Sequence, residues 1–146
     1  MSDGLDRVFT GEAAPGIYRF ASRRTPDTIC AQVEAHGWRC FRLDGRQVND
    51  KAEFLRESAA AMAFPSYFGH NWDAYEESIT DLEWAPAPGY VLLYDYVRWF
   101  AVYQPQDWDV ALDILAGAVD TWAQRNTPMF VLLRHAGRAL LHIPRL

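Results

Sequence analysis

The residues best suited to chemistry lie between positions 64 and 83, where carboxylates gather beside aromatic side chains. No lysine or arginine occurs between Arg56 and Arg98, so this stretch contains no cation of its own. Acids four residues apart on a helix repel each other by about 0.2–0.5 kcal/mol per pair. An ordinary solvated helix face usually mixes both signs of charge, whereas aromatic residues are enriched on binding surfaces. The pattern therefore favours a surface that binds a cationic partner.

A helix that begins after Asn71 would place these acids on one side. Asn71 is a favoured N-cap residue, and Asp73 in the first turn suits the positive end of the helix dipole. At about 100° per residue, the polar and apolar side chains separate onto opposite faces. The polar face carries Asp73, Glu76, Glu77 and Thr80, the apolar face carries Tyr75, Ile79 and Leu82, and Trp72 lies at the boundary.

The run from Pro65 to Tyr75 resembles the loop and second helix of the barstar family, whose members are small intracellular ribonuclease inhibitors. In one-letter code it reads PSYFGHNWDAY, which fits the approximate pattern P-x-[YF]-[YF]-G-x-N-x-D-A. A looser resemblance extends from Cys40 to about Arg134. The resemblance implies Asp73 and Glu77 as the main anions of a ribonuclease-binding site. The full set of implied contact residues is Tyr67, Gly69, Asn71, Trp72, Asp73, Glu76, Glu77 and Thr80.

Two positions depart from the family's pattern. Glu77 stands where the family has an aspartate, so the second anion is one methylene longer. Glu76 stands where the family has an aromatic residue, which adds charge and removes ring area. These departures leave open an alternative, a barstar-fold protein that binds a different basic protein without inhibiting a nuclease.

The chemistry of a ribonuclease explains why acids would suit an inhibitor. A site that holds a phosphodiester presents arginine, lysine and often histidine, and a carboxylate can occupy the phosphate position and accept their hydrogen bonds. Acids fixed on a helix lose less entropy when they bind. The resemblance implies an antitoxin or immunity protein that inhibits a small basic, barnase-like ribonuclease, as a monomer in a 1:1 complex.

Other chemistry is less well supported. His70, Asp73 and Glu77 could offer one nitrogen and two oxygens to a metal ion, but no second ligand cluster accompanies them. Paired carboxylates also act in glycoside hydrolysis, which needs a deep sugar cleft that a short chain with surface acids hardly provides. A glycine-rich phosphate loop and a serine elbow are both missing from the sequence. We expect no enzyme activity, no catalytic residue, no metal and no cofactor.

Composition sets the broad class. The chain has 146 residues, half of them hydrophobic, which suits one domain with a substantial core. Its formal net charge of -5 argues against direct binding of nucleic acid and favours a basic protein partner. Cys30 and Cys40 are too few for a dense disulfide framework, and no apolar run reaches the length of a membrane helix. A reduced, cytoplasmic protein without membrane contact is the simpler expectation.

Segments typical of strands and helices alternate along the chain, which predicts a small parallel β-sheet with helices packed around it. This α/β architecture agrees with a barstar-like fold. We expect a flexible tail over residues 1–15 and a single barstar-like domain over residues 16–146, with its core at 38–134. The C-terminal residues 134–146 are expected to cover an edge strand rather than bind a partner. The expected strands span residues 17–20, 38–43, 90–94 and 129–133, and the expected helices span about 26–36, 50–62, 72–82, 95–103 and 105–126.

Overall fold

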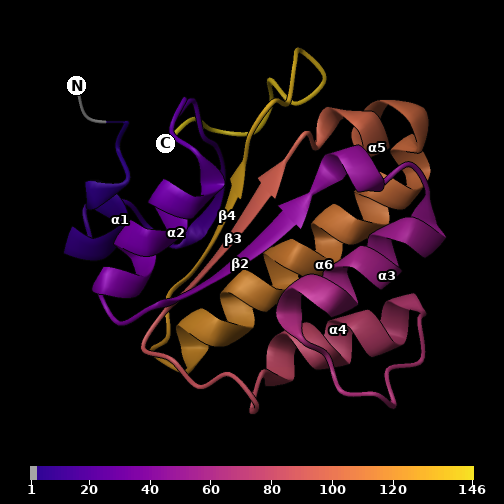
Figure 1. Ribbon diagram of the computed structural model, residues 1–146, viewed down its shortest axis with the longest axis horizontal. Helices are drawn as coiled ribbons and strands as arrows, with labels where there is room; N and C mark the ends of the chain where they lie inside the picture. Colours follow the sequence, from indigo (N-terminus) through magenta and orange to yellow (C-terminus); the bar gives the residue numbers. More distant parts are fainter. Residues whose placement is uncertain (1–2) are drawn as a thin grey trace.

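A four-stranded parallel sheet forms the centre of the computed structural model, which describes residues 3–146 (Figure 1). The strand order is β1-β4-β3-β2, so the first and last strands of the chain are neighbours. The expected α/β fold with a small parallel sheet is confirmed. The strands are β1 (Gly16–Arg19), β2 (Arg39–Asp44), β3 (Tyr90–Asp95) and β4 (Met129–Leu133).

Helices cover both faces of the sheet (Figure 1). One face carries α1 (Asp6–Thr10) and α2 (Pro26–Ala35). The other face carries α3 (Lys51–Met62), α4 (Trp72–Asp81), α5 (Arg98–Tyr103) and α6 (Pro105–Gln124). No helix within residues 3–146 is both long and apolar enough to cross a membrane.

Apart from Asp95 at the end of β3, the central strands are apolar because each of their faces meets a separate hydrophobic core. Along β3, Leu92 and Tyr94 point into the larger core beneath α3, α4 and α6, while Val91 and Leu93 belong to the smaller core beneath α1 and α2. All residues of β3 and β4 are buried. This matches the continuous apolar runs that parallel strands require.

The turn after β2 depends on a glycine. A short 3-10 helix, η1 (Gly45–Gln47), follows β2 and packs against the end of β3. A Cβ atom on Gly45 would lie 2.3 Å from the carbonyl oxygen of Asp95, so only glycine allows this close approach. The turn directs the chain into α3, whose N-cap Asp50 accepts a hydrogen bond from the backbone N–H of Glu53 at 2.8 Å.

Residues 3–15 pack against the sheet rather than extending as the expected flexible tail. Leu5 and Val8 are almost fully buried in the smaller core, beside Ile29 and Val33 of α2. The expectation is therefore corrected for this part of the chain, and residues 1 and 2 lie outside the described residues. A helix of five residues is too short to show the 3.6-residue period on which helix prediction depends.

The C-terminal segment covers the free edge of β1. The backbone N–H of Arg19 donates to the carbonyl of Pro144 at 2.8 Å, and the N–H of Leu146 donates to the carbonyl of Arg19 at 3.0 Å. Leu140 and Ile143 in the same segment are buried in the larger core. The favoured interpretation of residues 134–146, cover for an edge strand, is confirmed.

Cys30 and Cys40 form a disulfide, which corrects the expectation of a reduced pair. Helix α2 packs against β2 and brings the two Cα atoms to 5.4 Å, within the range that a disulfide spans. The sequence did not reveal this pairing because it depends on where α2 lies over the sheet. The reduced state was one reason to expect a cytoplasmic protein, and the structure removes that reason.

Candidate functional site

The start of α4 is fixed by the side-chain amide of Asn71. Its Oδ1 accepts a hydrogen bond from the backbone N–H of Ala74 at 2.8 Å, as the expected N-cap should. Its Nδ2 donates to the carbonyl of Gly69 at 3.3 Å. One amide therefore joins the preceding loop to the first turn of the helix.

The loop before α4 is anchored by one aromatic ring and presents another. Phe68 is buried, with its ring centroid 5.0 Å from that of Phe64. Tyr67, its neighbour, is 78 % exposed. His70 adopts a left-handed backbone (φ 52°), and its Nδ1 lies 3.1 Å from the carbonyl oxygen of Phe68. This tight turn holds Tyr67 in solvent beside the start of the helix.

Gly69 allows the Asn71 amide to occupy its position. A Cβ atom on Gly69 would lie 3.1 Å from Nδ2 of Asn71, tighter than nine in ten real Cβ contacts. A side chain at Gly69 would therefore press on the amide that caps α4. The glycine belongs to the expected set of contact residues, and the structure gives it a role in the geometry of the cap.

The two faces of α4 are those that the sequence predicts. Tyr75, Ile79 and Leu82 are buried against the larger core. The opposite face presents the acids to solvent, and within residues 3–146 none of them forms an ion pair. Asp73, Glu76 and Glu77 are exposed, and Thr80 is half-buried.

Trp72 lies at the boundary between the faces, as predicted, and is half-buried. Its ring packs beside Phe54 of α3, with 5.7 Å between the centroids. Nζ of Lys51 lies 5.5 Å from the centroid of the Trp72 ring, a cation–π contact. Lys51 is thus a cation at the edge of the acidic surface, and no local pattern in the sequence predicts that α3 would bring it there.

The last turn of α4 is held by helix α6. The indole N–H of Trp122 donates to the carbonyl of Ile79 at 2.9 Å, and Arg125 Nη1 donates to the carbonyl of Thr80. The hydroxyl of Thr80 donates to the carbonyl of Glu76 at 2.7 Å. Helix ends leave such carbonyls without partners, and a cation there suits the helix dipole. Trp122 and Arg125 lie more than forty positions along the chain from these partners, so local sequence patterns did not identify them.

These contacts fix α4 at both ends and leave its acids in solvent. The result is a preformed anionic surface flanked by Tyr67 and Trp72. Within residues 3–146, no three His, Cys, Asp or Glu side chains are placed to hold a metal ion together. The arrangement can therefore accept hydrogen bonds from cationic side chains of a partner without first ordering itself.

Comparison with known protein families supports this interpretation of the fold. The family model described as Barstar (barnase inhibitor) matches residues 38–134, from the residue before β2 to the residue after β4. The matched part contains the aromatic loop, all of α4 and the residues of α6 that hold it. Proteins of this family are inhibitors and not enzymes. No curated protein matches the chain in a sequence search. The chain belongs to the Barstar (barnase inhibitor) family.

Proposed function

We propose that this protein inhibits a small basic ribonuclease by placing the exposed face of α4 in the nuclease active site. In this proposal the carboxylates of Asp73 and Glu77 take the position of an RNA phosphate. The partner is a barnase-like ribonuclease, bound 1:1 by a monomer of this chain. Asn71, Glu76 and Thr80, with Tyr67, Gly69 and Trp72, complete the contact surface.

The single observation that carries the proposal is the unpaired state of the acids on α4. Folded proteins usually relieve clustered acids with nearby lysine or arginine, yet the acids of α4 form no ion pair within residues 3–146. A basic active site would supply the missing cations. The same surface would also raise the rate of encounter with a basic protein, and that gain would fall with salt.

The inhibitor proposal can be tested by partner capture. The immobilised protein would be exposed to extracts and medium of its source cells, beside an Asp73→Asn, Glu77→Gln double variant. The captured material would then be assayed for ribonuclease activity. The expected result is a small basic ribonuclease that the wild type binds and inhibits and that the double variant does not. A basic partner without nuclease activity would instead establish the alternative, an interaction protein that no longer inhibits a nuclease.

Once the ribonuclease is identified, single variants measure how much each acid contributes to its affinity. Asp73→Asn and Glu77→Gln should each weaken the complex by about 2–5 kcal/mol, mainly through faster dissociation, because each leaves a buried cation of the nuclease without its partner. Surface plasmon resonance gives both rates. Unchanged dissociation in either variant would remove that residue from the site.

Asp81→Asn is the matched control. Asp81 is an exposed acid in the last turn of the same helix, outside the proposed contact set. Its loss removes the same charge from the long-range field, so it should slow association slightly and leave dissociation unchanged. An effect as large as that of Asp73→Asn would mean that total charge, rather than contact at Asp73, determines affinity.

A further inference from the structure

The carboxyl ends of the four strands meet at an edge of the sheet that the ribonuclease proposal does not use. The loop after β1 leads to α2 on one face, while the loop after β3 leads to α5 on the other (Figure 1). Strand β4 lies between these two strands. In open α/β sheets, ligands bind outside the carboxyl ends of the strands, near the place where the connections change from one face to the other. Helix α4 lies with α3 and α6 on one face of the sheet, whereas the loop after β1 leads to α2 on the other face (Figure 1).

A hollow of about 310 Å³ lies at this edge, and its lining is rich in arginine. Ser22 contributes to its wall, as it does to a wider, open hollow of about 870 Å³ beside it. We refer to the two together as the carboxyl-edge cleft. Its arginines are Arg23, Arg24, Arg46 and Arg134 in the smaller hollow and Arg145 in the wider one.

Arg134 builds the floor of the cleft. Its guanidinium forms two hydrogen bonds with the carboxylate of Asp95, at 2.5 and 2.7 Å, and the Arg134 side chain is only 4 % exposed. Its Nη1 also donates to the carbonyls of Ser22 and Arg24, at 3.2 and 2.6 Å. A buried ion pair therefore fixes the loop after β1 in place.

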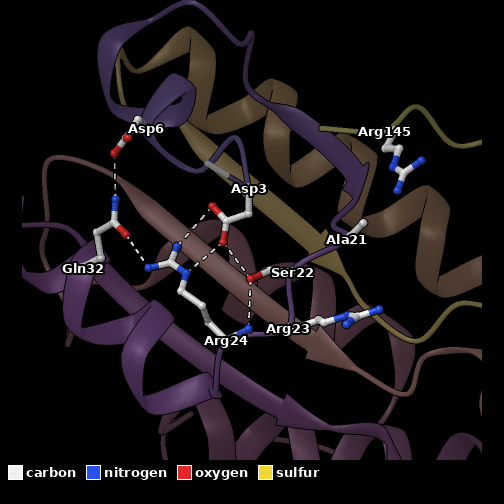
Figure 2. A pocket seen from close by; sticks show the side chains of 8 residues that line it. All are labelled: Asp3, Asp6, Ala21, Ser22, Arg23, Arg24, Gln32 and Arg145. Atoms are coloured by element: carbon white, nitrogen blue, oxygen red, sulfur yellow. Dashed lines mark hydrogen bonds and ion pairs between the residues drawn. The ribbon is translucent and has the colours of Figure 1, made fainter. Parts of the chain in front are cut away.

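Two other arginines of the cleft have no acidic partner. Figure 2 shows Arg24 bound to Asp3 and Gln32, while Arg23 and Arg145 stand outside this network. Within residues 3–146, neither Arg23 nor Arg145 forms an ion pair or a side-chain hydrogen bond. Exposed, unpaired guanidinium groups at a preformed hollow are unexpected in a chain with a net charge of -5.

The opposite wall of the carboxyl-edge cleft contains two residues with strained backbone conformations. Tyr96 and His135 follow the adjacent strands β3 and β4, and both adopt left-handed conformations, with φ of 57° and 53°. Their rings stack with centroids 4.2 Å apart, and the Arg46 guanidinium lies 5.0 Å from the centroid of the Tyr96 ring. Such backbone strain persists only where the surrounding structure holds it, and it is concentrated at ligand sites.

We propose that the carboxyl-edge cleft binds a small phosphorylated molecule, with Arg23 and Arg145 as the main ligands of its phosphate group. Guanidinium groups bind phosphate through paired, charge-assisted hydrogen bonds. A small ligand fits better than a nucleic acid, because the site is a hollow and the net negative charge of the chain repels a long polyanion.

Nuclear magnetic resonance titration of the isotope-labelled protein tests the proposal. Inorganic phosphate and adenosine 5′-diphosphate should each shift the amide signals of residues 21–25 and His135 in a saturable manner. Tighter binding of the diphosphate would identify the ligand as a phosphate ester, and equal binding would identify free phosphate. No saturable shift with either probe would overturn the proposal, as would an oligoribonucleotide whose affinity exceeds that of the diphosphate and grows with length.

Variants locate the site. Arg23→Gln and Arg145→Gln should each weaken binding of the tighter probe by about tenfold or more, the loss expected for one charge-assisted hydrogen bond. Arg56→Gln is the control, because Arg56 is an exposed arginine of α3 that pairs with Glu53 and Glu57. An equal loss in Arg56→Gln would show that only net charge matters and would overturn the proposal.

The ribonuclease proposal and the phosphate-binding proposal can be tested independently. The Asp73→Asn, Glu77→Gln double variant should bind the phosphate probes as the wild type does, because its changes lie on α4. Retained phosphate binding in that variant therefore tests the cleft even if no ribonuclease is captured.

Discussion

Asp3 illustrates how single residues decide which part of this chain is ordered. Its carboxylate accepts hydrogen bonds from Ser22 Oγ at 2.7 Å and from Arg24 Nε at 2.8 Å (Figure 2). Burial would raise the pKa of Asp3, but the hydrogen bonds from Ser22 and Arg24 outweigh it and lower the pKa below its ordinary value. The charged form of Asp3 is therefore the form that holds residues 3–15 against the sheet.

Asp3→Asn should lower the free energy of unfolding by about 1–2 kcal/mol at pH 7, since it removes a charge-assisted contact. A carboxyl whose pKa is lower in the folded chain stabilises the fold above its unfolded pKa and loses that effect as the pH falls through its folded pKa. The difference between wild type and variant should therefore shrink below about pH 4. Urea unfolding from pH 7 to pH 2.5 measures it, and Asp109→Asn, at an exposed acid of α6, is the control.

A difference that stayed constant over this range would mean that the charge of Asp3 contributes nothing. In that case the variant would act only through the shape of its side chain.

The residues of the acidic face could be predicted because their chemistry is local. Asn71 and Asp73 suit the start of a helix by type alone, and the structure confirms the cap. Lys51 and Trp122 could not be predicted, because their contacts with α4 arise from packing between helices distant in sequence. The disulfide between Cys30 and Cys40 could not be predicted for a similar reason, because it depends on how α2 lies over β2.

At the scale of elements, α4 is a helix whose stability comes from its two ends and one apolar face. Its acids repel one another, so its N-cap and its contacts with α6 must compensate. The binding surface is consequently sensitive to changes that touch no partner.

Asn71→Ala should lower the free energy of unfolding by about 0.5–2 kcal/mol, because the backbone N–H of Ala74 loses its acceptor. Asn71→Asp keeps a cap acceptor and should remain within about 0.5 kcal/mol of the wild type. Chemical denaturation of the free protein compares the two variants. Equal losses in both would show that the amide matters through its Nδ2 contact with Gly69 rather than as a cap.

Most element boundaries followed from the sequence, and the reasons differ between elements. The long α6 shows a clear helical period, and β3 and β4 are continuous apolar runs between turn residues. Helix α1 shows neither signal, because its five residues complete little more than one turn. The order of strands in the sheet is a matter of long-range pairing, which periodicity does not encode.

At the scale of the whole molecule, the disulfide joins parts that the family match separates. Cys30 lies before the matched residues 38–134, and Cys40 lies within them. The disulfide therefore ties α2 to the part of the fold that matches the family model, through β2. A covalent link of this kind stabilises a fold chiefly by restricting the unfolded chain.

Reduction should lower the free energy of unfolding by about 2–3 kcal/mol, the value expected for a short closed loop. Urea unfolding with and without dithiothreitol measures the loss. A Cys30→Ala, Cys40→Ala double variant should resemble the reduced protein and should not respond to the reductant. Equal stability of the wild type in both conditions would show that the bond adds nothing to the fold.

The pairing of β1 with β4 has a consequence for synthesis on the ribosome. Gly16 lies opposite Phe130, so β1 emerges from the exit tunnel long before β4, the strand with which it pairs within residues 3–146, exists. Until then β2 and β3 can pair with each other, but β1 has no sheet to join. The four residues of β1 are only half-buried even in the folded protein. While β1 is unpaired, it therefore exposes little apolar surface that could cause aggregation. The sheet can therefore be completed only after β4 has been synthesised, and it cannot grow from its first strand.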